Sequence, residues 1–159
     1  EQYALGFWHS YGLETVALRY FNVFGERQDP DSQYSAVIPK FLSIMREGNR
    51  PVIYGDGEQS RDFTHVDNVV QANLLSCIAE GAPGEAFNCA CNERVSLNDL
   101  VRMLNELLGT DIPAEYADDR AGDVKHSLAD ISKAERLLGY RIVTPFEEGL
   151  KRLVEQVSV

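Results

Sequence analysis

Hydrophobic residues recur along this chain at two different spacings, which predicts helices interleaved with short strands. The spacing of an amphipathic helix covers six stretches: 1–11, 35–47, 67–78, 96–108, 130–139 and 144–157. Short runs rich in β-branched and aromatic residues, typical of strands, are 15–21, 51–54, 61–66, 86–91 and 113–117. Residues 22–34 combine Gly, Asp-Pro and Ser, and are expected to form a long polar loop.

Capping residues support several of these boundaries. Asp67 is the expected N-cap of the third helix. Ser96 followed by Asp99 resembles a capping box, and Thr144 followed by Pro145 is typical of a helix start. Small strands between helices predict an α/β fold, and no repeat, low-complexity tract or flexible linker interrupts it.

Composition excludes some classes of function. The formal net charge of −10 argues against non-specific nucleic-acid binding, which needs a basic face. No apolar run approaches the roughly 18 residues that a membrane span needs. No signal peptide is visible, and the chain does not begin with Met, so we expect residue 1 not to be the start of the gene product.

The three cysteines predict a reducing compartment rather than a metal centre. Their odd number, with no secretory context, indicates free thiols and a cytoplasmic protein. Cys89 and Cys91 lack the spacing and the second ligand pair of a zinc site, so no metal site is expected. Alternation along a strand places both on one face, which favours buried packing.

Three segments occur together in an order that is informative. They are LRYFNVFGERQDP at 18–30, IYGDGEQSRDFTHVDN at 53–68 and RAGDVKHSLADISKAERLLGY at 120–140. Together they resemble the C-terminal part of an extended short-chain dehydrogenase/reductase, in the group of UDP-glucose and UDP-N-acetylglucosamine 4-epimerases.

This resemblance covers nearly the whole chain and implies a fold and a division. The fold is α/β, the C-terminal part of an NAD(P)-binding Rossmann-type enzyme with a small mixed α/β substrate domain. Residues 1–34 would end the dinucleotide-binding core, and 35–159 would form the nucleotide-sugar binding domain. The implied reaction is NAD-dependent epimerisation at C4 of a UDP-hexose.

Asn22 follows the end of a predicted strand, where α/β proteins place ligands. On residue chemistry alone, its amide serves equally to satisfy the backbone of its own loop. The resemblance makes Asn22 a ligand of the substrate phosphate, and Phe21 and Val23 contacts to the nicotinamide of NAD.

Two arginines are candidates for the diphosphate. Taken alone, Arg61 reads as a surface residue paired with Asp62, and Arg120 with Asp123 reads as a loop ion pair. The resemblance instead assigns Arg61 and Arg120 to the pyrophosphate, and Asp123 to the ribose hydroxyls of the nucleotide. Two guanidinium groups on one diphosphate are chemically reasonable, since each donates in parallel to non-bridging oxygens.

Five further residues are implied at the base and the sugar-phosphate. The backbone of Ala36 and Val37 would face the uracil, and Gln28 would reach the sugar-phosphate. Val52 and Tyr54 alternate along a strand and share one face, with Tyr54 covering the base and Val52 flanking it. Packing of Val52 in a core is an equally good reading.

Ser127 lies four residues after Asp123, at a position where family members restricted to plain hexoses can carry a bulky Tyr. A small residue there leaves room for a 2-acetamido group. The hypothesis is therefore that the substrate is an N-acetylated UDP-hexose.

The general base of the family, a Tyr in a Tyr-x-x-x-Lys pair, is not in this sequence. Tyr3 is followed four residues later by Phe7, and Tyr11 by Thr15. We therefore expect no catalytic residue in this chain, a preceding Rossmann half that carries the pair and the glycine-rich turn, and no epimerase activity from the chain alone. The resemblance also implies a homodimer for the intact enzyme.

Other readings stay open. Sister activities share these motifs, namely those of a 4,6-dehydratase, a sugar-acid decarboxylase or a UDP-glucuronate 4-epimerase. A non-catalytic nucleotide-sugar binding or assembly module is a different class, and the isolated chain is also open to self-association through strand 15–21. His65 and Asp67 resemble a catalytic pair, but we interpret both as structural.

Overall fold

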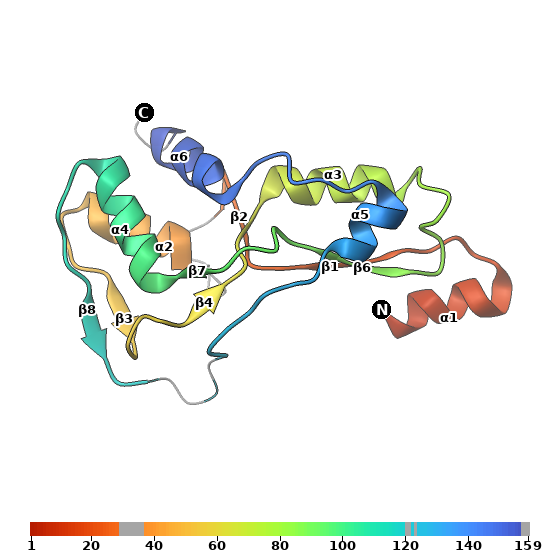
Figure 1. The fold of residues 1–159 in the computed structure, drawn as a ribbon, viewed down its shortest axis with the longest axis horizontal. Helices are drawn as coiled ribbons and strands as arrows, with labels where there is room; N and C mark the ends of the chain where they lie inside the picture. Colours follow the sequence, from red (N-terminus) through yellow and green to blue (C-terminus); the bar gives the residue numbers. More distant parts are fainter. Residues whose placement is uncertain (29–36, 120–121, 123, 157–159) are drawn as a thin grey trace.

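The computed structural model describes residues 1–28, 37–119, 122 and 124–156. These residues form two lobes joined side by side, with the C-terminus on one and the N-terminal helix at the far end of the other (Figure 1). The helices are α1 Gln2–Tyr11, α2 Val37–Arg46, α3 Val66–Ser76, α4 Leu97–Leu108, α5 Ser132–Leu138 and α6 Phe146–Gln156. The strands are β1 Ala17–Tyr20, β2 Val23–Phe24, β3 Val52–Tyr54, β4 Ser60–Arg61, β5 Thr64–His65, β6 Ala86–Cys89, β7 Val95–Ser96 and β8 Glu115–Ala117.

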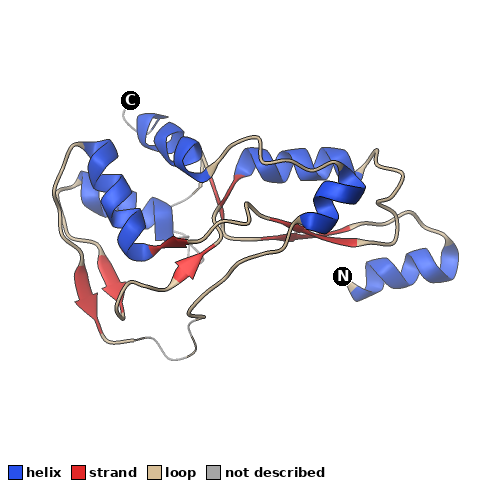
Figure 2. Cartoon of the chain, in the orientation of Figure 1, coloured by secondary structure: helices blue, strands red, loops and turns tan. Residues whose placement is uncertain are grey.

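The strands pair two by two rather than in one broad sheet, as Figure 2 shows. The pairs β1–β6, β2–β5 and β3–β8 are parallel, and β4–β7 is antiparallel. Parallel pairing joined by helical crossovers confirms the α/β class predicted from the sequence.

The first lobe is built on the β1–β6 pair. Helices α3 and α5 share its apolar core with these two strands, and α1 lies on the other side of the pair from α3 (Figure 1). Phe87 and Tyr140 are its largest fully buried side chains, each 1% exposed. Burial raises the pKa of Tyr140, whose hydroxyl donates to the carbonyl oxygen of Ala90 over 2.9 Å.

The second lobe packs α2, α4 and α6 around aromatic rings from β2 and from the start of α6. Phe146 stacks on Phe63 with ring centroids 5.5 Å apart and meets Phe24 edge to face, also at 5.5 Å. Ring pairs of this kind add about 0.5–1.5 kcal/mol beyond the area they bury. This core holds β5 and the segment before it in a fixed position between the two lobes.

Most predicted elements are confirmed, with three local corrections. The strand predicted over 61–66 is two short strands, β4 and β5, because the chain changes partner between them: β4 pairs with β7 and β5 pairs with β2. The N-cap of α3 is His65 rather than Asp67, since the ring Nδ1 accepts the N–H of Asp67. The predicted loop 22–34 begins with a short strand at Val23–Phe24, and residues 29–34 lie outside the described part.

Other boundaries agree with the sequence. Ser96 caps α4 by accepting the N–H of Asp99 over 3.0 Å, as its capping motif predicts. The expected helix start at Thr144 and Pro145 differs slightly, because α6 begins at Phe146 and the Thr144 hydroxyl donates to the carboxylate of Asp67 over 3.1 Å. None of the helices in the described part of the chain has the length and hydrophobicity that crossing a bilayer requires.

The proposed boundary between residues 34 and 35 stays a prediction. Elements on its far side contribute to both lobes, because α3, β6 and α5 share the core of β1 while α2, α4 and α6 build the other core.

Candidate functional site

Asn22 lies where the N-terminal strand changes partner. The N–H of Phe21 still donates to the carbonyl of Cys89 in the first lobe, whereas Val23 already pairs with Thr64 in the second. Asn22 has a left-handed backbone with φ of 35°, a conformation that Asn tolerates better than most residues. The chain therefore turns at Asn22, at the carboxyl end of β1.

The side chain of Asn22 is held by the segment around β4, not by its own loop. Its Nδ2 donates to the carbonyl oxygen of Asp62 over 3.0 Å, and its own carbonyl accepts the N–H of Thr64 over 3.2 Å. These two bonds orient the amide, so Oδ1 is presented in one direction. The alternative reading, in which the Asn22 amide hydrogen-bonds the backbone of its own loop, is therefore wrong.

Arg61 is half-buried on the same segment. One of its terminal nitrogens, Nη1, lies 3.0 Å from the carbonyl oxygen of Ser60 and 3.4 Å from that of Lys125. The alternative reading, a surface arginine paired with Asp62, does not fit the structure, because the side chain of Asp62 is fully buried and both its carboxylate oxygens accept backbone N–H groups.

Ser127 is brought to β4 by backbone pairing over a large sequence distance. The N–H of Ser60 donates to the carbonyl of Lys125 over 2.9 Å, and the N–H of Ser127 donates to the carbonyl of Ser60 over 3.0 Å. Ser60 Oγ also lies 3.0 Å from Nδ1 of His126. The half-buried Ser127 therefore runs parallel to the strand that carries Arg61.

Asp62 is the fully buried centre of this arrangement. Its Oδ1 accepts the N–H of Cys91 over 2.9 Å and its Oδ2 accepts the N–H of Ala129 over 3.1 Å. Burial raises the pKa of Asp62, and the hydrogen bonds from backbone amides oppose that rise. The carboxylate thus ties the ends of β6 and of the Ser127 segment to β4.

The residues implied at the base are placed on the second lobe. Val52 and Tyr54 lie on the same outward face of β3, each 37% exposed, with Ile53 buried between them. The reading of Val52 as a core residue is therefore wrong. The Tyr54 carbonyl accepts the side-chain amide of Gln59 over 2.6 Å, which ties β3 to β4.

The remaining predicted residues divide into described and undescribed ones. Val37 begins α2 and packs against the core of the second lobe. Gln28 is half-buried and donates through Nε2 to the carbonyl of Val23 over 3.3 Å. The predicted ligands Ala36, Arg120 and Asp123 lie outside the described residues.

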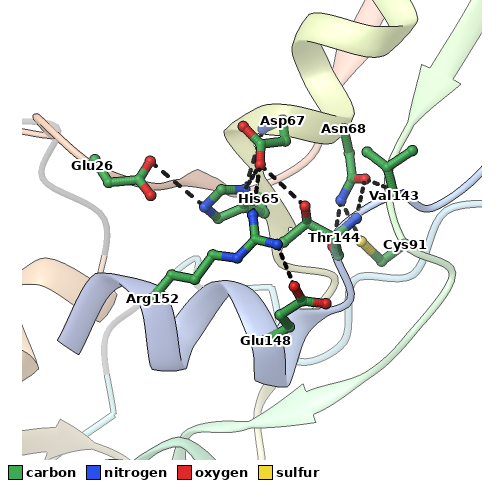
Figure 3. Close-up of polar contacts among 9 residues, drawn as sticks. All are labelled: Glu26, His65, Asp67, Asn68, Cys91, Val143, Thr144, Glu148 and Arg152. Atoms are coloured by element: carbon green, nitrogen blue, oxygen red, sulfur yellow. Dashed lines mark hydrogen bonds and ion pairs between the residues drawn. The ribbon is translucent and has the colours of Figure 1, made fainter. Parts of the chain in front are cut away.

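His65 and Asp67 form a structural cluster beside the site, as the sequence indicated (Figure 3). His65 is fully buried, with Nδ1 accepting the N–H of Asp67 and Nε2 lying 3.7 Å from a carboxylate oxygen of Glu26. The carboxylate of Asp67 also forms an ion pair with Arg152, whose Nη1 lies 3.1 Å away, and Arg152 forms a second ion pair with Glu148. This cluster joins α3, α6 and the segment after β2.

No metal centre is present among the residues that the structure describes. Cys89 and Cys91 are buried free thiols on the core side of β6 and the residues after it, which confirms the packing prediction. A cavity of about 370 Å³ lies between α4 and residues 110–113, and none of the predicted ligands lines it.

Sequence reasoning missed Asp62, Gln59 and Ser60 as members of the site. Asp62 entered only as a surface partner of Arg61. A usable signal existed, since an acidic residue inside a strand-like run is rarely buried unless it is hydrogen-bonded.

The geometry can be set beside known proteins. Residues 1–90 match the family described as NAD dependent epimerase/dehydratase. The structure superposes on UDP-N-acetylglucosamine 4-epimerase from Methanobrevibacter ruminantium, in complex with UDP-N-acetylmuramic acid, with a TM-score of 0.92 and 46% identity, covering 99% of this chain and 50% of that one. For UDP-glucose 4-epimerase from Thermotoga maritima with UDP-glucose, the TM-score is 0.93 and the identity 39%, with the same coverage.

Curated relatives widen the range of activities. UDP-glucuronate 4-epimerase of Thermodesulfobacterium geofontis is 36% identical over 92% of this chain and 44% of its own length. The human dTDP-D-glucose 4,6-dehydratase is 32% identical over 98% of this chain and 45% of its own length. The chain thus spans about half the length of the relatives it matches.

The family match and the fold agree with each other. This chain belongs to the NAD dependent epimerase/dehydratase family, as a part that corresponds to the C-terminal half of an extended short-chain dehydrogenase/reductase.

Proposed function

We propose that this chain is the nucleotide-sugar-binding part of an NAD-dependent enzyme that epimerises UDP-hexoses at C4. One observation carries the proposal: Asn22, Arg61 and Ser127 come from three distant segments and meet along β4. Each had been assigned to the substrate by resemblance alone, and none is close to another in sequence.

The residues present fit one end of the cofactor. Phe21 and Val23 flank the turn at Asn22, at the carboxyl end of a parallel strand pair, which is where open α/β sheets bind ligands. When bound, NAD would accept the hydride from C4 of the sugar and return it. Phe21 and Val23 would contact its nicotinamide, and the rest of the cofactor would lie on the preceding part of the protein.

The role of this chain would be to hold UDP while the hexose turns. Asn22 offers an amide donor and an acceptor to the phosphate or sugar. Arg61, already oriented by two carbonyl oxygens, would donate to the diphosphate together with Arg120, while Asp123 would accept the ribose hydroxyls. Each charge-assisted bond would contribute about 1.5–3 kcal/mol.

The base and the sugar would be recognised from both sides of β4. Tyr54 and Val52 present one exposed face of β3 to the uracil, and the backbone of Ala36 and Val37 would lie opposite. Gln28 would reach the sugar-phosphate.

UDP binding is the first test of this role. In calorimetric titrations, Arg61→Ala should weaken UDP binding by about tenfold or more, because one charge-assisted contact is lost. Arg102→Ala is the matched control, since the side chain of Arg102 is 59% exposed on α4 and forms ion pairs with its helix neighbours Asp99 and Glu106. Equal UDP affinity for wild type and Arg61→Ala would contradict the proposal.

Substrate choice is the finer part of the proposal. The small side chain at Ser127, beside β4, would leave space for the 2-acetamido group of an N-acetylated UDP-hexose. In the complete gene product, Ser127→Tyr should lower kcat/KM for UDP-N-acetylglucosamine by about tenfold or more while sparing UDP-glucose.

Leu128→Tyr is the matched control for that experiment. It adds the same ring at the next residue, whose side chain is 42% exposed, and should leave both substrates unaffected. Unchanged turnover of UDP-N-acetylglucosamine by Ser127→Tyr would remove the N-acetyl hypothesis and leave the epimerase proposal standing.

Sister reactions are the second candidates, because relatives of similar identity act on UDP-glucuronate or dehydrate dTDP-glucose. NMR analysis of products separates them, since epimerisation gives a C4 epimer and dehydration gives a 4-keto-6-deoxy sugar. UDP binding with no turnover of any nucleotide sugar by the complete gene product would favour a binding module.

The catalytic base is proposed to lie on a preceding Rossmann half, in a Tyr-x-x-x-Lys pair. The intact protein is proposed to be a cytoplasmic homodimer. Two observations support the proposal that it is longer than this chain. The relatives are about twice as long, and Tyr3 and Tyr11 of α1 are 88% and 78% exposed in the described structure. On this proposal, the chain alone would bind nucleotide sugars without converting them.

A further inference from the structure

Asp62 is connected by hydrogen bonds to several parts of the candidate site, beyond what is needed to satisfy its own buried carboxylate. Its carboxylate oxygens accept one backbone N–H each, from Cys91 at 2.9 Å and Ala129 at 3.1 Å. Its backbone carbonyl accepts Nδ2 of Asn22 at 3.0 Å, and it directly follows Arg61 in the chain. Asn22 is therefore one hydrogen bond away from Asp62, Arg61 is its neighbour in the chain, and Ser127 lies two residues before its hydrogen-bond partner Ala129.

Each connection controls a different part of the site. The bond to Ala129 fixes the segment in which Ser127 lies two residues earlier, alongside β4. The bond to Cys91 fixes the end of β6, the strand that pairs with β1 just before Asn22. Rotation or loss of this carboxylate would therefore shift Ser127 and Asn22 relative to Arg61.

We propose that Asp62 is the positioning residue of the nucleotide-sugar site, holding Asn22, Arg61 and Ser127 in mutual register without touching the substrate. This inference rests on the proposed function of the same site. It adds a residue to which neither the motifs nor the resemblance had given a role.

The burial of Asp62 supports this role. The side chain is fully buried, and both its oxygens accept hydrogen bonds from backbone N–H groups. An uncharged side chain that donates, such as an amide NH₂, would place one donor against another at this position. Burial raises the pKa of Asp62, and the backbone N–H groups that its carboxylate accepts oppose that rise by favouring the charged form.

The test exchanges one atom in the complete gene product. Asp62→Asn keeps the shape but places an NH₂ group against the N–H of Cys91 or Ala129, which releases one tether. We expect KM for the UDP-sugar and Kd for UDP to rise about tenfold, with kcat changed by less than about twofold. The reason is that the site would bind the substrate and the transition state more weakly by the same amount, which raises KM and leaves kcat unchanged.

Asn68→Asp is the matched control (Figure 3). Asn68 is equally buried, and its Nδ2 donates to the Thr144 carbonyl over 2.7 Å while Oδ1 accepts the N–H of Val143 over 2.8 Å. The exchange is the reverse isosteric one, and its bonds at 2.7 and 2.8 Å face a segment that carries no predicted ligand. The contact of Asn68 with Cys91 is to Sγ at 3.6 Å and not to the backbone N–H that Asp62 accepts. It should lower the melting temperature but leave KM and Kd for UDP unchanged.

The outcomes separate the two levels of the argument. If wild-type protein does not bind UDP, the proposed function fails; if wild type binds and Asp62→Asn binds as tightly, only the positioning role fails. Asp62→Ser, which keeps one short acceptor, is the second variant. If neither Asp62 variant folds while Asn68→Asp does, the inference is also overturned, because the carboxylate would then hold the whole core rather than the site.

Discussion

The reactivity of the three thiols follows from where each one lies. Cys77 is exposed after α3, whereas Cys89 and Cys91 are buried. Burial raises the pKa of Cys91 to about 12, and the carboxylates of Asp62 and Glu93 act in the same direction. Since the thiolate is the reacting species, Cys91 is expected to be unreactive at pH 8.

Alkylation of the native protein should therefore be selective. With iodoacetamide at pH 8, mass spectrometry should find the adduct at Cys77, and Cys89 and Cys91 should react only after denaturant is added. A Cys77→Ser variant, used as control, should lose the native adduct. Modification of Cys91 at the rate of Cys77 in folded protein would contradict its burial.

Single residues also show the limit of sequence reasoning. The chemistry of Asn22 and Arg61 was readable from their types, but their partners were not. From sequence alone, Arg61 reads as paired with the adjacent Asp62. In the structure, the carboxylate of Asp62 accepts a hydrogen bond from the N–H of Ala129, which is far away in sequence. Contacts between distant segments depend on packing, and local propensity carries no information about them.

Among the elements, α6 is packed unusually close to β5. A Cβ built on Gly149 would lie 2.7 Å from Cδ2 of His65 and 3.0 Å from Cζ of Phe24. The glycine costs helix stability but allows the helix to approach the buried ring. Capping at Ser96 was predicted from sequence because it is local, while this close approach was not.

Gly149→Ala should lower the free energy of unfolding by about 1–3 kcal/mol, because overpacking exceeds the gain in helix propensity. Gly6→Ala in α1 is the matched control, since nothing lies within 4 Å of the added Cβ, and it should be neutral or stabilising by up to about 1 kcal/mol. Urea unfolding of both variants measures the difference. If the Gly149→Ala variant were as stable as the wild type, α6 and β5 would have to be able to move apart without cost, which would contradict this prediction.

On the scale of the whole molecule, α1 is the helix whose side chains are not covered by other elements. No residue of α1 is buried, and Phe7 is 48% exposed with its ring centroid 5.4 Å from that of Tyr11. Strand β1 pairs with β6 and, among the described residues, has no strand on its other side. An exposed aromatic stripe beside a free strand edge favours association.

The 159-residue chain alone should therefore associate as its concentration rises. Phe7→Lys combined with Tyr11→Lys should shift sedimentation-velocity profiles towards the monomer. Leu107→Lys, at a 37% exposed position on α4, is the control and should not do so. A wild-type chain that stays monomeric at high concentration would disprove this expectation.

The amino-acid sequence determined the class of fold, the positions of most helices and strands, and the family, because periodicity, caps and motif order are local properties of the chain. It also identified Asn22, Arg61 and Ser127 as candidate ligands. Their meeting along β4, the partner change at Asn22 and the role of Asp62 depended on the folded structure. Hydrogen bonds between segments up to 67 residues apart made these connections, and they form only when two separate cores bring the segments together.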